Sequence, residues 1–126
     1  MKILIVGSRS IKDFDLSQYI KAEVDTVISG GACGIDSIAE RYADDHRLSK
    51  IIMRPRYDLY GRAAPLRRNE YMVDIADEVL VIWDGHSRGT KYTLNYIKRQ
   101  NKKTTLITGN RIVYTEDETA VTVDIE

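Results

Sequence analysis

The 126-residue chain has few of the residues that mark a secreted, membrane-spanning or zinc-stapled protein. It has a single cysteine, Cys33, so no disulfide can form within it, and we expect a reducing, cytoplasmic compartment. Cys33, His46 and His86 are its only soft metal ligands, so we expect no metal site. No apolar run approaches the length that crosses a bilayer, and no secretory signal pattern opens the chain. We therefore expect no membrane partner.

The chain also carries no net charge, because 19 basic residues balance 19 acidic residues. A neutral chain is poorly suited to coating nucleic acid, so we do not expect nucleic acid as the main partner. The charges are segregated, however: residues 54–68 hold five arginines against Asp58 alone, and residues 116–126 are acidic without a basic residue. The arginine cluster indicates a site for a small anion. Pairing of the two segments between subunits would form a homo-oligomer, which we expect.

What the chain does have is a regular alternation of short apolar runs with runs of helical period, which predicts one α/β domain over residues 1–126. Continuous apolar strands are typical of parallel sheets, so we expect a mainly parallel five-stranded sheet with right-handed crossovers. The predicted strands are 2–6, 25–29, 50–53, 78–83 and 104–108, and the predicted helices are 14–22, 34–47, 65–77 and 90–101.

The tail, residues 109–126, follows a different pattern. Gly109-Asn110 is a two-residue hairpin signal between the runs 104–108 and 111–115, and residues 120–125 alternate apolar with polar side chains. We expect an antiparallel β-hairpin extension at one edge of the sheet. Such an extension would protect that edge or contact another subunit.

Three glycine-bearing junctions each follow a predicted strand. Ligands of open parallel sheets bind beyond the carboxyl ends of the strands, where helix N-termini offer free N–H groups and partial positive charge. Junctions that face one crevice, with arginines beside them, predict a nucleotide or sugar-phosphate ligand. The alternative is that these glycines only make tight turns between strands and helices. The junctions are Gly7-Ser8-Arg9, Ser29 to Asp36, and Asp84 to Thr90.

Four strings at these junctions and beside them resemble the SLOG superfamily, above all its small stand-alone members, some of which phages encode. The resemblance covers roughly residues 3–108 and implies a Rossmann-like three-layer sandwich that binds a nucleotide or nucleotide-derived ligand, as a sensor or carrier. No dinucleotide G-x-G-x-x-G or Walker-type motif is present. The strings are G-S-R (7–9), I-S-G-G-A-C-G-I-D-S-I-A-E-R-Y-A (28–43), Y-G-R-A-A-P-L-R-R-N-E-Y-M (60–72) and I-W-D-G-H-S-R-G-T-K (82–91).

The resemblance and the junctions together name the candidate ligand-binding residues. One loop would cradle phosphate with Gly30, Gly31 and Gly34, and a second with the residues that lead into the last helix. Asp36 either caps its helix or accepts a hydrogen bond from a ribose hydroxyl. The remaining candidates are Gly7, Ser8, Arg9, Arg68, Asn69, Asp84, Ser87, Arg88, Gly89 and Thr90.

One difference from the motif of the enzymes in this superfamily leaves open whether the chain catalyses a reaction. The LOG phosphoribohydrolases of this superfamily carry P-G-G-x-G-T-x-E-E, and this chain has Tyr92 at the glutamate position. Nucleotide N-glycosidase chemistry needs a carboxylate, for which Asp36 and Glu70 are the candidates. A second alternative is single-stranded nucleic-acid binding, as in the related protein DprA. Beyond a nucleotide ligand, no cofactor is expected.

Overall fold

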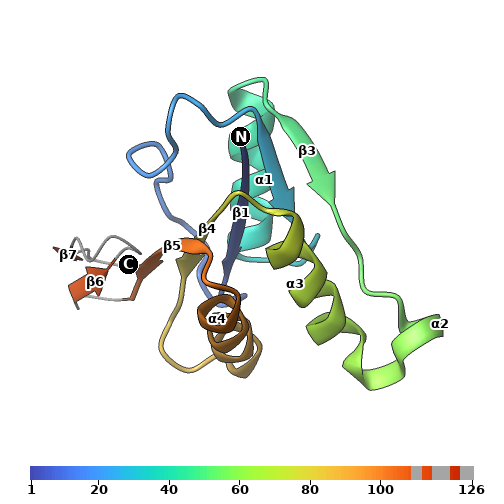
Figure 1. Cartoon of the computed structure of the whole chain (residues 1–126). Helices are drawn as coiled ribbons and strands as arrows, with labels where there is room; N and C mark the ends of the chain where they lie inside the picture. The colour runs from blue at the N-terminus through green and yellow to red at the C-terminus, as the bar shows by residue number, and fades with distance from the viewer. Residues whose placement is uncertain (109–111, 115–119, 123–126) are drawn as a thin grey trace.

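The computed structural model describes residues 1–108, 112–114 and 120–122 (Figure 1). At its centre lies an all-parallel, five-stranded sheet in the order β3-β2-β1-β4-β5. The predicted parallel sheet is confirmed, and every predicted strand matches within one residue at either end. The strands are β1 (Lys2–Gly7), β2 (Thr26–Ser29), β3 (Ser49–Ile52), β4 (Glu78–Ile82) and β5 (Lys103–Ile107).

Helices cover both faces of the sheet, which confirms the three-layer, Rossmann-like sandwich. Successive side chains of β1 point to opposite faces, so Ile3 and Ile5 join one buried cluster and Leu4 and Val6 join the other. The first cluster includes residues of α1 and the second includes residues of α3 and α4. These helices are α1 (Ile35–Asp45), α3 (Ala64–Ile75) and α4 (Arg88–Gln100) (Figure 1).

The connection from β1 to β2 contains no helix, so the helix predicted at 14–22 is wrong. The carboxylate of Asp15 accepts hydrogen bonds from the amide and hydroxyl of Ser17, a local bond that favours a turn over a helix. Ile11 and Leu16 are buried in the same cluster as α1. Burial of these two anchors holds the segment on the sheet without helical periodicity.

A short arm that the sequence did not predict projects between β3 and α3. It comprises α2 (Tyr57–Tyr60) and the 3-10 helix η1 (Gly61–Ala63), and it lies at the end of the molecule remote from β6 (Figure 1). Leu59 is 61% exposed and Tyr60 is 51% exposed, so the arm presents large apolar side chains to solvent.

The expected hairpin extension is not supported in the form predicted. The antiparallel strands β6 (Ile112–Tyr114) and β7 (Ala120–Thr122) pair with each other in a separate two-stranded sheet, and β5 pairs with β4. The predicted turn at Gly109-Asn110 lies outside the described residues. In the described part of the chain, no helix has the length and apolar character needed to cross a membrane.

Candidate functional site

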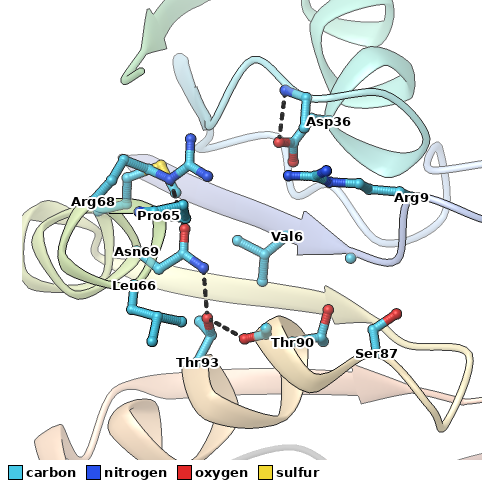
Figure 2. Close-up of a pocket in the computed structure, with 14 residues that line it drawn as sticks. Val6, Arg9, Asp36, Pro65, Leu66, Arg68, Asn69, Ser87, Thr90 and Thr93 are labelled. Atoms are coloured by element: carbon cyan, nitrogen blue, oxygen red, sulfur yellow. Dashed lines mark hydrogen bonds between the residues drawn. The ribbon is translucent and has the colours of Figure 1, made fainter. Parts of the chain in front are cut away.

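The candidate site lies where the strand order reverses, between β1 and β4. The chain moves outward from β1 to β2 and β3, then returns to place β4 on the other side of β1, which makes this the switch point of the sheet. A cavity of about 300 Å³ opens there, beyond the carboxyl end of β1 (Figure 2). Its lining residues are Val6, Gly7, Arg9, Ala32, Asp36, Pro65, Leu66, Arg68, Asn69, Met72, Ser87, Gly89, Thr90 and Thr93.

Asp84 fixes the loop that leads from β4 into α4. Its carboxylate accepts hydrogen bonds from the amides of His86 (2.8 Å) and Ser87 (2.9 Å) and from the Ser10 hydroxyl (2.7 Å). The buried hydroxyl oxygen of Ser8 accepts a bond from the Asp84 amide at 2.9 Å, which ties this loop to the end of β1. Partial burial opposes ionisation of Asp84, but these hydrogen bonds prevail and hold its pKa well below the usual range.

The first amides of α4 remain available to a ligand. The N–H groups of Arg88, Gly89 and Thr90 donate no hydrogen bond to any residue that the structure describes, and Ser87 at the N-cap makes no side-chain cap. A Cβ atom at Gly89 would meet nothing within 4 Å, so the cavity leaves room beside the helix start. Free N–H groups at a helix N-terminus are a suitable environment for an anion.

The glycines of the β2–α1 junction, by contrast, are surrounded by the chain's own groups. A Cβ atom at Gly30 would come within 2.6 Å of Arg68 Nη1, and one at Gly31 within 2.7 Å of Arg54 Nη1. Gly34 has a φ of +73°, and its Cα faces the backbone of Arg9, 2.6 Å from where a Cβ would lie. The three glycines predicted to cradle phosphate here therefore serve close packing, and none of them lines the cavity.

Asp36, at the start of α1, lines the cavity and is only 9% exposed. Its Oδ2 accepts a hydrogen bond from the Ala32 amide at 3.1 Å in the loop that precedes α1. The helix begins after Gly34 without a side-chain cap, so the capping role that the sequence suggested as one alternative is not supported. Burial raises the pKa of the Asp36 carboxyl; the hydrogen bond from Ala32 and the nearby Arg68 and Arg9 oppose the shift, while Glu40 adds to it.

Arg68, on α3, is a half-buried cation whose position is fixed by the backbone around it. Its Nη1 donates to the carbonyl oxygens of Gly30 (2.6 Å) and Met53 (3.0 Å), and its Nε donates to Asn69 Oδ1 (2.7 Å). Burial lowers the pKa of Arg68, although the neighbouring Asp36 opposes that shift. Because these bonds leave Nη2 without a described partner, Arg68 brings a positioned donor to the cavity wall.

Asn69 connects Arg68 to the start of α4 through a chain of hydrogen bonds (Figure 2). Its Nδ2 donates to Thr93 Oγ1 at 2.9 Å, and the Thr93 hydroxyl donates to the Gly89 carbonyl at 2.9 Å. Both ends of the Asn69 amide are thus used within the protein. Asn69 positions α3 against α4 at the cavity.

Arg9 is exposed at the rim of the cavity, and its side chain makes no hydrogen bond or ion pair within the described part of the chain. Figure 2 shows Arg9 and Asp36 on one side of the end of β1, and Ser87 and Thr90 on the other. A ligand that reaches both sides must cross over Val6 and Gly7.

Of the residues proposed from the sequence, some line the cavity and others support it. Glu70 is among those outside it: it accepts hydrogen bonds from Arg67 and the Tyr92 hydroxyl, of which the Tyr92 bond contributes most to lowering its pKa. Gly7, Arg9, Asp36, Arg68, Asn69, Ser87, Gly89 and Thr90 line the cavity. Ser8, Gly30, Gly31, Gly34, Glu70, Asp84 and Arg88 do not.

Sequence reasoning missed the apolar part of the wall and one polar residue. Thr93 is 1% exposed, and a threonine three positions after Thr90 on the apolar face of a helix was a signal that could have found it. Pro65, Leu66 and Met72 gave no signal, because only packing decides which face of α3 meets the cavity. Val6 ends a predicted strand and Ala32 lies within a predicted junction, but neither was named as a candidate.

Among the described residues, no group of three or more histidine, cysteine, aspartate or glutamate side chains is placed to hold a metal ion. Comparison of the chain with protein-family models, with curated proteins and with solved structures finds no significant match.

Proposed function

We propose that this protein binds a nucleotide or nucleotide-derived small molecule in the cavity, with a phosphate group at the start of α4, and acts as a sensor or carrier. The observation that carries the proposal is the set of free amides of Arg88, Gly89 and Thr90 at the switch point of a parallel sheet. Such amides bind phosphate through hydrogen bonds and through the partial positive charge of the helix end.

The charges and shape of the cavity support the same ligand. Arg9 and Arg68 bring two cations against the single carboxylate of Asp36, which favours an anion overall. Leu66 and Met72 give one wall an apolar character that suits a base or another flat group. A volume of about 300 Å³ fits a small ligand and not a long polymer.

The proposal is tested by mass spectrometry of the small molecules that copurify with the protein, followed by calorimetric titration with nucleoside monophosphates, NAD and ADP-ribose. A matched pair of variants, Gly89→Glu and Gly89→Gln, separates charge from bulk. The glutamate suits a helix N-terminus, so the variant should fold, but its carboxylate would occupy the phosphate position. We expect Gly89→Glu to lose binding and Gly89→Gln to lose less. Absence of binding by the unmodified protein, or equal binding by Gly89→Glu, would contradict the proposal.

A second candidate function is hydrolysis of the N-glycosidic bond of a nucleotide, as in the phosphoribohydrolases. The observation in its favour is that Asp36 is a buried carboxyl in the cavity with a raised pKa, a property that suits a general acid. The assay is release of free base and ribose phosphate from nucleoside monophosphates, which Asp36→Asn should abolish. Recovery of intact nucleotide would leave binding as the function.

Self-association stays a prediction, and we propose the arm as its surface. Tyr57, Leu59 and Tyr60 are exposed there, and the ion pairs Arg56–Asp58 and Arg67–Glu70 place both signs of charge on the same patch. A patch with both signs can be complementary to a second copy of itself. Light scattering should report a dimer that Leu59→Glu dissociates, and a monomer at all concentrations would contradict self-association. A salt-sensitive gel shift of single-stranded nucleic acid would instead favour the alternative of nucleic-acid binding.

A further inference from the structure

The cavity holds a carboxylate on the side away from α4, and half of that carboxylate lacks a partner. Asp36 is only 9% exposed, and its Oδ2 accepts a hydrogen bond from the Ala32 amide at 3.1 Å. No described residue donates a hydrogen bond to Oδ1. Among the described residues no buried side-chain oxygen lacks a hydrogen bond, so the unpaired Oδ1 is accessible from the cavity and can accept a donor that arrives with the ligand.

A positioned donor lies beside this acceptor. Arg68 Nη1 and Asp36 Oδ2 lie 2.6 and 2.9 Å from the same point, the position that a Cβ atom would take at Gly30. The two side chains are therefore close neighbours, although no ion pair joins them within the described residues. Arg68 Nη2 is free while Nε and Nη1 are held by Asn69 and by backbone carbonyls. This side of the cavity thus offers one acceptor and one donor together.

The location of Asp36 argues against a phosphate at that position. The order β2-β1-β4 puts the start of α1 on one side of the end of β1 and the start of α4 on the other (Figure 2). Phosphate at α4 would be separated from the Asp36 carboxylate, whereas phosphate beside Asp36 would be repelled. A hydroxyl group fits the Asp36 side, because it donates to a carboxylate and accepts from a guanidinium.

We infer that Asp36, beside Arg68, recognises a ribose hydroxyl, so that the cavity selects ribonucleotides over 2′-deoxyribonucleotides. The inference rests on the proposed binding of a nucleotide phosphate at α4 and adds the class of sugar. The 2′-hydroxyl donates to Asp36 Oδ1, and the neighbouring hydroxyl accepts from Arg68 Nη2. A deoxyribose cannot donate this hydrogen bond to Asp36 Oδ1.

The test compares sugar phosphates that differ only in this hydroxyl. Calorimetric titration with ribose 5-phosphate and 2-deoxyribose 5-phosphate avoids any assumption about the base, and the pairs AMP/dAMP and GMP/dGMP extend it. We expect the ribose member of each pair to bind about 10- to 100-fold more tightly, the range for a hydrogen bond to a charged group.

The variant Asp36→Asn keeps a carbonyl oxygen for the Ala32 amide and removes the free acceptor. We expect it to bind both members of each pair with the affinity that the unmodified protein has for the deoxy member. Glu40→Gln is the matched control: Glu40 lies on the same helix, accepts from Ser29 at 2.7 Å and does not line the cavity, so the preference should persist.

The outcomes separate this inference from the proposed function. Equal affinity of the unmodified protein for both sugars overturns the inference while phosphate binding stands. A ribose preference that survives in Asp36→Asn, or that Glu40→Gln also removes, overturns the role of Asp36. Failure of every probe to bind overturns the proposed function, and the sugar selectivity with it.

Discussion

The β2–α1 and β4–α4 junctions share a glycine-rich sequence and differ in what surrounds their glycines. At the first, a Cβ atom at Gly30 would lie less than 3 Å from the guanidinium of Arg68, and one at Gly34 less than 3 Å from the backbone of Arg9. At the second, Gly89 faces open space at the start of α4. The first junction is therefore part of the structure that supports the cavity, whereas the second is part of the cavity itself.

This difference shows that glycine at a strand–helix junction has two separate uses. One is close packing within the protein, which needs no ligand. The other is to leave room for a ligand beside free amides, which the protein itself does not fill. The predictions below test this division, beginning with the largest expected effect on stability.

The same substitution at the two junctions should have different consequences. Gly34→Ala places a Cβ atom on a residue with a φ of +73° and within 2.6 Å of the Arg9 backbone, so we expect a loss of about 3 kcal/mol in the free energy of unfolding. Gly89→Ala meets no neighbour and adds helix propensity, so stability should stay within about 1 kcal/mol of the unmodified protein. Urea denaturation measures both; similar losses at the two positions would refute the division.

Asp84 should stabilise the loop before α4 in a pH-dependent way. Asp84→Asn removes charge-assisted hydrogen bonds to the His86 and Ser87 amides, and we expect a loss of about 2 kcal/mol at neutral pH. The folded pKa lies below the ordinary 3.8, so the unfolded state takes up the proton first. The contribution is complete above about pH 4 and disappears as the pH falls through the folded pKa.

Denaturation of the unmodified protein and of Asp84→Asn across this acid range tests the prediction. The two free energies of unfolding should converge as the pH falls. A difference of the same size at pH 7 and in strong acid would mean that the asparagine acts through its shape and not through its charge.

The sheet could be predicted from sequence because its signal is local. The central strands β1, β2 and β4 are short runs whose side chains are mostly buried on both faces, and such runs predict strands without reference to the rest of the chain. The edge strands β3 and β5 are less buried, but each still contains a short apolar run. The helix prediction for residues 14–22 was wrong because a few apolar side chains, including Leu16, are buried there without forming a helix. The short arm was not predicted for the related reason that its two helices, of four and three residues, are too short to show periodicity.

The site was predictable in location and only partly in composition. Glycines after parallel strands indicated the crevice at the end of β1, and a cavity that Gly7 and Gly89 line opens there. Sequence alone does not show that Arg68 crosses to Gly30 and fills its junction, because that contact joins residues 38 positions apart. Nor does it show that Glu70 faces Arg67 and Tyr92 instead of the cavity.

Asp36 should reduce the stability of the folded state at neutral pH. Burial raises its folded pKa above the unfolded value, so the folded state takes up the proton first, and ionisation above the folded pKa is unfavourable to folding. We expect Asp36→Asn to unfold at a higher urea concentration than the unmodified protein at pH 7. That advantage should shrink as the pH falls through the raised folded pKa towards the ordinary 3.8. A variant that is less stable at pH 7 would contradict the assignment.

Arg9 should have the smallest effect on stability and a clear effect on binding. Its exposed side chain makes no hydrogen bond or ion pair with the described residues, so Arg9→Ala should change the free energy of unfolding by less than about 0.5 kcal/mol. Loss of a charge-assisted contact should weaken nucleotide binding by about 1–3 kcal/mol, measured by titration. Lys98→Ala, on α4 outside this cavity, controls for the loss of one positive charge. Equal weakening by both variants would mean that Arg9 acts through net charge alone and makes no contact with the ligand.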